Sequence, residues 1–112
     1  MYKKIMKNKT IGHITCKLGQ SAIENWELFE AASPEHYFFH LSSYPSGYLI
    51  LETDDPSIDV IFECALLCKN GTKYRNLKNV NVDYCLCSNL KKGLSVGEVQ
   101  FIRPRKVKKI KI

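Results

Sequence analysis

The chain has 112 residues, enough for one domain with a modest core, and its hydrophobic fraction of 45% is typical of a globular protein. No apolar run approaches the roughly twenty residues of a membrane-spanning helix, and the first residues lack the apolar segment of a signal peptide. Five cysteines, an odd number, in a chain without an export signal predict reduced thiols and a cytoplasmic location.

Charge is distributed unevenly along the chain. Residues 20–63 contain no lysine or arginine but hold nine of the eleven acidic residues, whereas the rest carries all 17 basic residues and only Asp83 and Glu98. The net charge of +6 therefore combines −9 in this segment with +15 outside it. A basic surface of this kind predicts a polyanionic partner, most often nucleic acid. The alternative is a solvated basic face that serves only solubility.

The first half predicts two strand regions and a helix. After a basic lead over residues 1–10, residues 11–18 are typical of a strand or hairpin arm. Ser21 and Glu24 fit a capping box, and the helix that they begin should end before Ser33-Pro34. Residues 37–41 and 48–51 then predict a hairpin around a turn that contains proline and glycine.

The second half predicts one helix and three strands. Asp55 should cap the helix, with Pro56 at its first position, and apolar residues on two sides indicate a central, largely buried helix. A basic connection and an alternating strand at residues 80–84 follow, then a basic loop at 88–93 and strands within 96–102 and 107–112. The order ββαββαβββ predicts a single α+β domain with a mainly antiparallel sheet.

A series of short motifs in fixed order carries a resemblance to a known domain. The motifs are Gly19 with Glu24-Asn25 and Leu28, Phe38-Phe39-His40-Leu41, Tyr44-Pro45-Ser46-Gly47-Tyr48, Val80-Asn81-Val82-Asp83-Tyr84, Ser88-Asn89-Leu90-Lys91-Lys92 and Val96-Gly97-Glu98-Val99. From about residue 11 to residue 112, their order and spacing resemble the signature of the NFACT-R domain. That signature has a glycine, a Q/E-N pair, a D-x-W-F-H-V strand, a P-G-S-H-V turn, a V-x-Y strand, an N-V/L-K-K loop and a P/V-G-x-V turn.

NFACT-R domains are regarded as RNA-binding modules of ribosome-associated quality-control factors and of small eukaryotic proteins with a coiled-coil tail. The resemblance therefore implies RNA, either tRNA or ribosomal RNA, as the partner, with the ribosome as a further candidate. The chain is similar to the module alone, so the tail-adding activity of the larger factors is not implied. The chain departs from the family at His36, Phe38, Tyr48, Glu52 and Gln20, where the family has aspartate, tryptophan, histidine, arginine and a basic residue.

The expected contacts with nucleic acid are mostly basic. Lys91 and Lys92 are adjacent in the best-matched motif and suit backbone phosphates. His40 matches the family histidine, and Tyr48 flanks a turn at which an unstacked base could stack on its ring. Lysines of the last strand should alternate between its two sides, so only some can contact a ligand. The complete expected set is Asn89, Lys91, Lys92, Lys73, Arg75, Arg103, Arg105, His40 and Tyr48.

Catalysis and metal binding are not expected. His36 and His40 would share one side of a strand, but no nucleophile with a triad-like context accompanies them. Cys64 and Cys68, like Cys85 and Cys87, lack the spacing of common zinc sites and are expected to be buried thiols. Phe38, Phe39 and Trp26 are expected in the core.

The predicted function is non-catalytic RNA binding through backbone phosphates, with no cofactor. One alternative is a protein-interaction module that docks on the ribosome or a translation factor, which the nine carboxylates of residues 20–63 favour. Another is a DNA-binding variant, because phosphate contacts alone do not distinguish the two nucleic acids.

Overall fold

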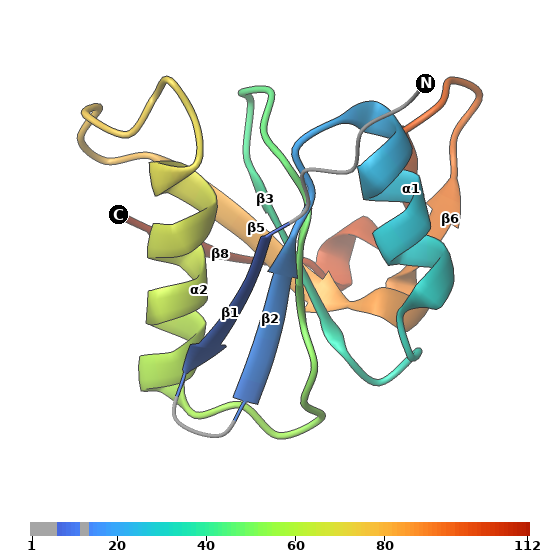
Figure 1. The fold of residues 1–112 in the computed structure, drawn as a ribbon, viewed down its shortest axis with the longest axis horizontal. Coiled ribbons are helices and arrows are strands. Elements are labelled where there is room, and N and C mark those ends of the chain that lie inside the picture. Colours follow the sequence, from blue (N-terminus) through green and yellow to red (C-terminus); the bar gives the residue numbers. More distant parts are fainter. Residues whose placement is uncertain (1–6, 12–13) are drawn as a thin grey trace.

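The computed structural model describes residues 7–11 and 14–112, and its architecture is α+β, as predicted. Six strands form an antiparallel sheet in the order β1-β2-β4-β3-β5-β8 (Figure 1). These strands are β1 (Lys7–Ile11), β2 (Ile14–Leu18), β3 (Tyr37–Leu41), β4 (Leu49–Leu51), β5 (Asn81–Leu86) and β8 (Lys108–Lys111). A separate hairpin contains β6 (Leu90–Lys92) and β7 (Val99–Phe101), and the helices are α1 (Ala22–Ala31) and α2 (Ile58–Asn70). Two 3-10 turns, η1 (Cys87–Asn89) and η2 (Pro104–Lys106), flank the hairpin.

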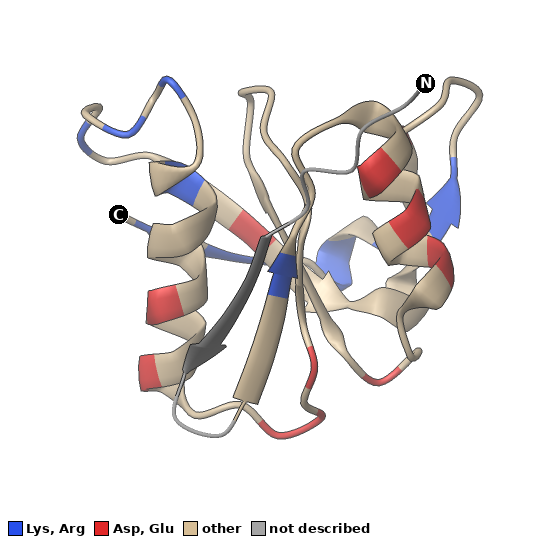
Figure 2. Cartoon of the chain, viewed as in Figure 1, with Lys and Arg blue, Asp and Glu red and all other residues tan. Residues whose placement is uncertain are grey.

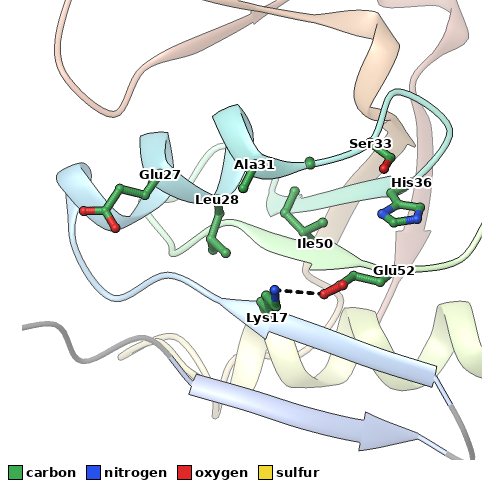
Figure 3. Close-up of a pocket in the computed structure, with 9 residues that line it drawn as sticks. Lys17, Glu27, Leu28, Ala31, Ser33, His36, Ile50 and Glu52 are labelled. Carbon is green, nitrogen blue, oxygen red and sulfur yellow. Dashed lines mark ion pairs between the residues drawn. The ribbon is translucent and has the colours of Figure 1, made fainter.

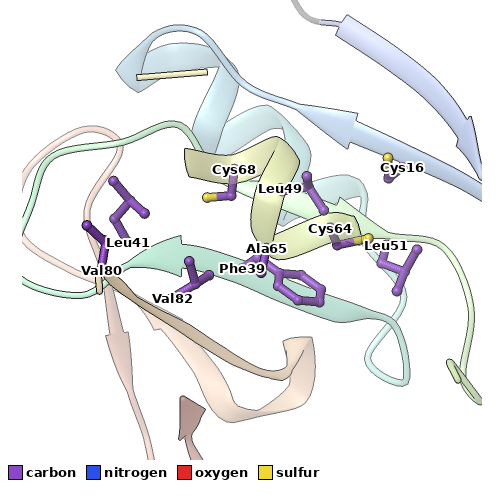
Figure 4. Packing of buried hydrophobic residues seen from close by; sticks show 10 residues of the cluster. All are labelled: Cys16, Phe39, Leu41, Leu49, Leu51, Cys64, Ala65, Cys68, Val80 and Val82. Carbon is purple, nitrogen blue, oxygen red and sulfur yellow. The ribbon is translucent and has the colours of Figure 1, made fainter. Parts of the chain in front are cut away.

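The large sheet has a buried cluster on each face, because successive strand residues point to opposite sides. On β3, Phe39 packs in the cluster under α2, and its neighbour Phe38 packs under α1 and the β6–β7 hairpin. Figure 4 shows the α2-side cluster, made of Cys16, Phe39, Leu41, Leu49, Leu51, Cys64, Ala65, Cys68, Val80 and Val82. The α1-side cluster contains Leu28, Phe38, Tyr48, Ile50, Cys85, Cys87 and Leu90. The core positions predicted for the two phenylalanines are therefore confirmed.

Both helices begin at a serine. The Ser21 hydroxyl accepts the Glu24 N–H at 3.2 Å, and the Glu24 carboxylate accepts the N–H of Gln20 at 2.8 Å, so the predicted capping of α1 is confirmed. The start predicted for α2 is two residues too early. Ser57 is its N-cap and accepts the Val60 N–H at 3.2 Å, which leaves the Asp55-Pro56 pair ahead of the helix.

The prediction of a largely buried α2 is also wrong. Cys64, Ala65 and Cys68 face the sheet, but Ile58 is 68% exposed and Phe62 is 44% exposed. A helix that covers one face of a sheet from outside has only one side to bury, however apolar its other side is.

The basic loop predicted over residues 88–93 is instead partly strand. Lys91 lies opposite Gln100 in the β6–β7 pairing, and the buried Leu90 holds the strand against the α1-side cluster.

The basic lead overlaps β1, and residues 1–6 lie outside the described residues. Neither α1 nor α2, the two helices of the described part, is long and apolar enough to cross a membrane.

Candidate nucleic-acid interface

Several residues of the motif series meet at one junction between α1, the β3–β4 connection and the β6–β7 hairpin. Gly19 N donates to Tyr48 O at 2.9 Å, and Tyr48 N donates to Asn25 Oδ1 at 3.0 Å. The Tyr48 hydroxyl donates to Gly97 O and accepts the Val99 N–H at 3.1 Å. We call this arrangement the Tyr48 junction, and it fastens three segments that are far apart in the sequence.

Two glycines of the motif series are required by close packing at this junction. Gly97 has φ +85°, and a Cβ there would lie 2.7 Å from the Cβ of Ala22. A Cβ on Gly47 would lie 1.9 Å from the carbonyl oxygen of Gly19. The short distances between these backbones, and not a bound ligand, explain why the motifs contain glycine.

The expectation that Tyr48 forms an exposed stacking platform is wrong. The residue is 6% exposed, its ring meets that of Phe38 edge-on at a centroid distance of 4.9 Å, and burial raises the pKa of its hydroxyl. Tyr44, on the other side of the turn, is half-buried and packs against Tyr74 with the ring centroids 4.5 Å apart. The sequence could not show this burial, because the groups that bind the Tyr48 hydroxyl come from residues about fifty positions later.

His40 lies beside the junction on the α1 face of β3. Its ring is 5.4 Å from that of Tyr48, and its backbone is opposite that of Asp83 on β5. Burial lowers the pKa of His40, and the nearby Asp83 carboxylate acts in the opposite direction. That carboxylate also lies 2.5 Å from the Lys109 ammonium and accepts the Ser42 hydroxyl at 2.5 Å. Lys109 is therefore engaged within the fold.

His36 immediately precedes β3 and, like His40, lies on the α1 side of the sheet. It lines a cavity of about 360 Å³ between α1 and the sheet, together with Lys17, Glu27, Leu28, Ala31, Ala32, Ser33, Ile50 and Glu52 (Figure 3). The Lys17 ammonium lies 3.0 Å from Oε1 of Glu52. The cavity therefore combines an apolar floor with two carboxylates and one paired lysine, a poor match for phosphate.

The adjacent lysines of β6 have different surroundings. Lys92 Nζ lies 2.5 Å from a Glu30 carboxylate oxygen and 4.5 Å from the centre of the Trp26 ring. Trp26 is half-buried and donates its Nε1–H to Glu98 O at 2.9 Å, so it connects α1 to the hairpin and does not lie in the core as expected. Lys91 points to the opposite side of β6, is exposed, and forms no ion pair within the described part of the chain.

Asn89 supports the segment that carries the predicted arginines. Its Nδ2 donates to Arg103 O at 3.0 Å, and its Oδ1 accepts the Arg103 N–H at 2.8 Å. The side chain that was expected to contact RNA is thus used within the fold. Arg103 and Arg105 remain exposed at η2.

The predicted cations form two exposed groups. The first, which we call the C-terminal basic strip, consists of Lys91, Arg103, Arg105, Lys106, Lys108 and Lys111. Figure 2 shows these segments in blue at β6, η2 and β8, whereas the acidic residues concentrate on α1, α2 and the loop after β4. Within β8, Lys108 lies opposite Tyr84 and Lys109 opposite Asp83, so the expected alternation of its lysines is confirmed.

The second group follows α2. Lys73 and Arg75 are exposed on the connection from α2 to β5, and the Lys73 ammonium is 5.4 Å from the Tyr74 ring centre. This connection ends beside the last strand, because Val80 and Ile112 exchange two backbone hydrogen bonds of 2.8 Å. The connection that carries the second group therefore ends next to β8, which carries part of the first.

Cys64, Cys68, Cys85 and Cys87 are buried free thiols, as predicted, and Cys16 is buried as well. Cys64 and Cys68 belong to the α2-side cluster and Cys85 and Cys87 to the α1-side cluster, so the sheet separates the two pairs. Burial raises the pKa of Cys68 to about 12 and that of Cys85 to about 11. Residues 7–11 and 14–112 contain no group of histidine, cysteine and carboxylate side chains able to hold a metal ion.

The sequence matches no protein-family model and no curated protein. A solved structure does match: the C-terminal part of the fibronectin/fibrinogen-binding protein from Streptococcus suis, with a TM-score of 0.85 and 25% identity. The match covers all of this chain and 45% of that one. The two share a fold, and this chain spans less than half the length of the matched chain.

Proposed function

We propose that this domain binds RNA without catalysis, through backbone phosphates. The observation that carries the proposal is the C-terminal basic strip. Residues 99–112 contain six lysines and arginines and no acidic residue, and all of these cations except Lys109 extend from the fold without a carboxylate partner among the described residues. Phosphate contacts require exposed, unpaired cations of this kind.

The resemblance to NFACT-R domains adds the class of RNA to the proposal. On that basis, the ligand is tRNA or ribosomal RNA in ribosome-associated quality control. The strip contains no set of side chains arranged to read base edges, so binding should depend weakly on sequence and strongly on salt.

Titrations of a labelled RNA hairpin at several salt concentrations test the proposal. Arg105→Gln should weaken binding and reduce the slope of log affinity against log salt by about 0.7–0.9, the contribution of one phosphate contact. Lys17→Gln is the matched control, since it removes the same charge from a lysine that is paired with Glu52. Affinity that does not change with salt, or equal losses from both variants, would contradict the proposal.

A DNA hairpin of the same sequence distinguishes the nucleic acids. Tighter binding to the RNA would support the proposal and would indicate contacts with the 2′-hydroxyl or the shape of RNA in addition to phosphates, whereas tighter binding to the DNA would favour the DNA-binding alternative.

Protein docking is a second candidate. On α2, the exposed Ile58 and Phe62 lie among the acidic residues Asp59 and Glu63, which gives an apolar patch with a negative rim. In addition, the matched Streptococcus suis protein is named for binding fibronectin and fibrinogen. Capture from a cell extract with and without nuclease separates the candidates. A partner lost on nuclease treatment supports RNA, and a partner retained after treatment but lost with Phe62→Lys supports docking.

A further inference from the structure

A groove of about 520 Å³ lies at the end of the molecule where four connections converge, beside the Tyr48 junction. Its walls include the backbones of Gly19, Gly47, Gly71 and Gly97. The absence of side chains lets these backbones approach their neighbours closely, as the 1.9 Å between a Cβ built on Gly47 and the Gly19 carbonyl oxygen shows, and the groove lies between the connections that they bring together. A volume of this size is within the range of about 300–1,000 Å³ that is usual for small-molecule sites.

A buried carboxamide supplies the groove with a hydrogen-bond donor. Asn25 lines the groove and is only 9% exposed. Its Oδ1 accepts the Tyr48 N–H, whereas its Nδ2 forms no hydrogen bond with the described residues. An amide nitrogen carries two donors, so this group remains able to bind the edge of a base or a phosphate oxygen.

The rim supplies a positive charge and an aromatic ring. Lys73 is the one charged residue among the described residues that line the groove, and it is exposed. Tyr74 also lines the groove, and its ring centre lies 5.4 Å from the Lys73 ammonium and 4.5 Å from the Tyr44 ring centre. The cavity of Figure 3, by comparison, is lined by two carboxylates. The electrostatics of the groove therefore suit an anionic ligand with an aromatic part.

We propose that this groove receives one unstacked nucleotide of the bound RNA, an inference that rests on the proposed function. The phosphate would lie at Lys73, the base would stack against Tyr74, and the Asn25 amide would donate to the base edge. Stacking requires a base that is not in a duplex, so the groove should prefer single-stranded or looped RNA. The C-terminal basic strip, which meets phosphates only, gives no such preference.

Two residues of the β6–β7 connection provide a matched pair of variants. Val96 lines the groove and is 57% exposed, whereas Leu94 is 98% exposed and does not line it. Val96→Glu and Leu94→Glu each place one carboxylate in the same connection. Only the first brings that charge to the proposed nucleotide site, so general electrostatic effects cancel in the comparison.

The probes are labelled octauridylate and a blunt 16-base-pair RNA duplex, titrated by fluorescence anisotropy. Val96→Glu should weaken octauridylate binding about tenfold, which corresponds to about 1.4 kcal/mol, and Leu94→Glu less than about twofold. The two variants should affect the duplex equally. Equal effects on octauridylate would overturn the groove site and leave RNA binding intact, whereas failure of the unmodified domain to bind either RNA would overturn both.

Uridine monophosphate gives a test that does not depend on a variant folding. In an NMR titration of the unmodified domain, the amide signals of Gly19, Gly47 and Gly71 should shift together with the side-chain amide of Asn25. Shifts confined to the C-terminal basic strip would overturn the inference.

Discussion

The two faces of the large sheet are closed in different ways. Under α2, one helix covers a cluster of aliphatic, aromatic and thiol side chains, and the burial of these groups stabilises this side of the fold. On the other face, α1 and the β6–β7 hairpin share the covering, and polar groups join them: Asn25, the Tyr48 hydroxyl and Trp26 Nε1 all make hydrogen bonds between segments.

The difference is in what holds each face together. Burial of apolar and thiol side chains holds the α2 side, whereas hydrogen bonds hold the hairpin and the loops in place on the α1 side. The groove takes residues from both sides, with Asn25 from α1 and Tyr74 from the residues that pack against the α2-side cluster. Substitutions on the two faces should therefore have different effects.

The largest effect is expected for Phe39→Ala in the α2-side cluster. The ring is fully buried, and its loss leaves a cavity, so the free energy of unfolding should fall by about 3–5 kcal/mol. Urea denaturation measures the change. Phe62→Ala, on the exposed side of α2, is the control, and a comparable loss there would show that the outer surface of the helix is covered in solution.

Tyr48→Phe should have the next largest effect. It keeps the ring in the α1-side cluster but leaves Gly97 O and the Val99 N–H without their partner, at a cost of about 1–3 kcal/mol. Faster hydrogen exchange at the Val99 amide should accompany the loss. Tyr44→Phe removes a hydroxyl for which the described residues offer no hydrogen-bond partner, and it should be nearly neutral. A neutral result for Tyr48→Phe would mean that the junction does not join the hairpin to α1.

The α1 side should also make stability depend on pH through His40. On the α2 side, no histidine is buried among the described residues. Burial lowers the pKa of His40 below its usual 6.5, so in this pH range the unfolded chain binds more protons than the folded one. Its contribution to stability is therefore complete above pH 6.5 and is lost as pH falls from 6.5 toward the folded pKa. Urea denaturation at pH 7.5 and 5.5 should give a larger drop for the unmodified domain than for His40→Gln. A larger drop for the variant would contradict the lowered pKa of His40.

The smallest effects on stability are expected on the hairpin surface. Lys92→Ala breaks the contacts with Glu30 and Trp26, both partly exposed, and should cost no more than about 1 kcal/mol. Lys91→Ala should change stability by less than about 0.5 kcal/mol and yet weaken RNA binding more than Lys92→Ala. Melting curves with parallel RNA titrations make the comparison. If Lys92→Ala weakened RNA binding more than Lys91→Ala, Lys91 would not belong to the interface.

Local signals predicted most of the fold. Ser21 and Glu24 identified the start of α1 because capping depends on residues three positions apart, and the alternating sequence at residues 80–84 identified the strand β5, both faces of which are buried. The three-residue strand β6 was missed, since two lysines and a glycine after Leu90 are equally typical of a loop. β6 is a strand because it pairs with β7, and no local sequence pattern specifies that pairing.

The candidate site was harder to predict than the fold. The exposed cations of the C-terminal basic strip follow directly from a segment without acidic residues. The burial of Tyr48 and the internal bonds of Asn89 depend on backbone groups distant in the sequence. The groove could not be predicted, because its walls are glycine backbones whose approach is a property of the fold. The repeated glycines of the motif series were the one available signal.

The Tyr48 junction also has a consequence for the kinetics of folding. The groups that bind the Tyr48 hydroxyl belong to residues 49 and 51 positions later in the chain, so closing the junction requires a long loop to form first. We therefore expect the junction to close after the transition state for folding. Tyr48→Phe should then speed unfolding while leaving the refolding rate almost unchanged, and during synthesis the α1 face should stay open until the hairpin has emerged.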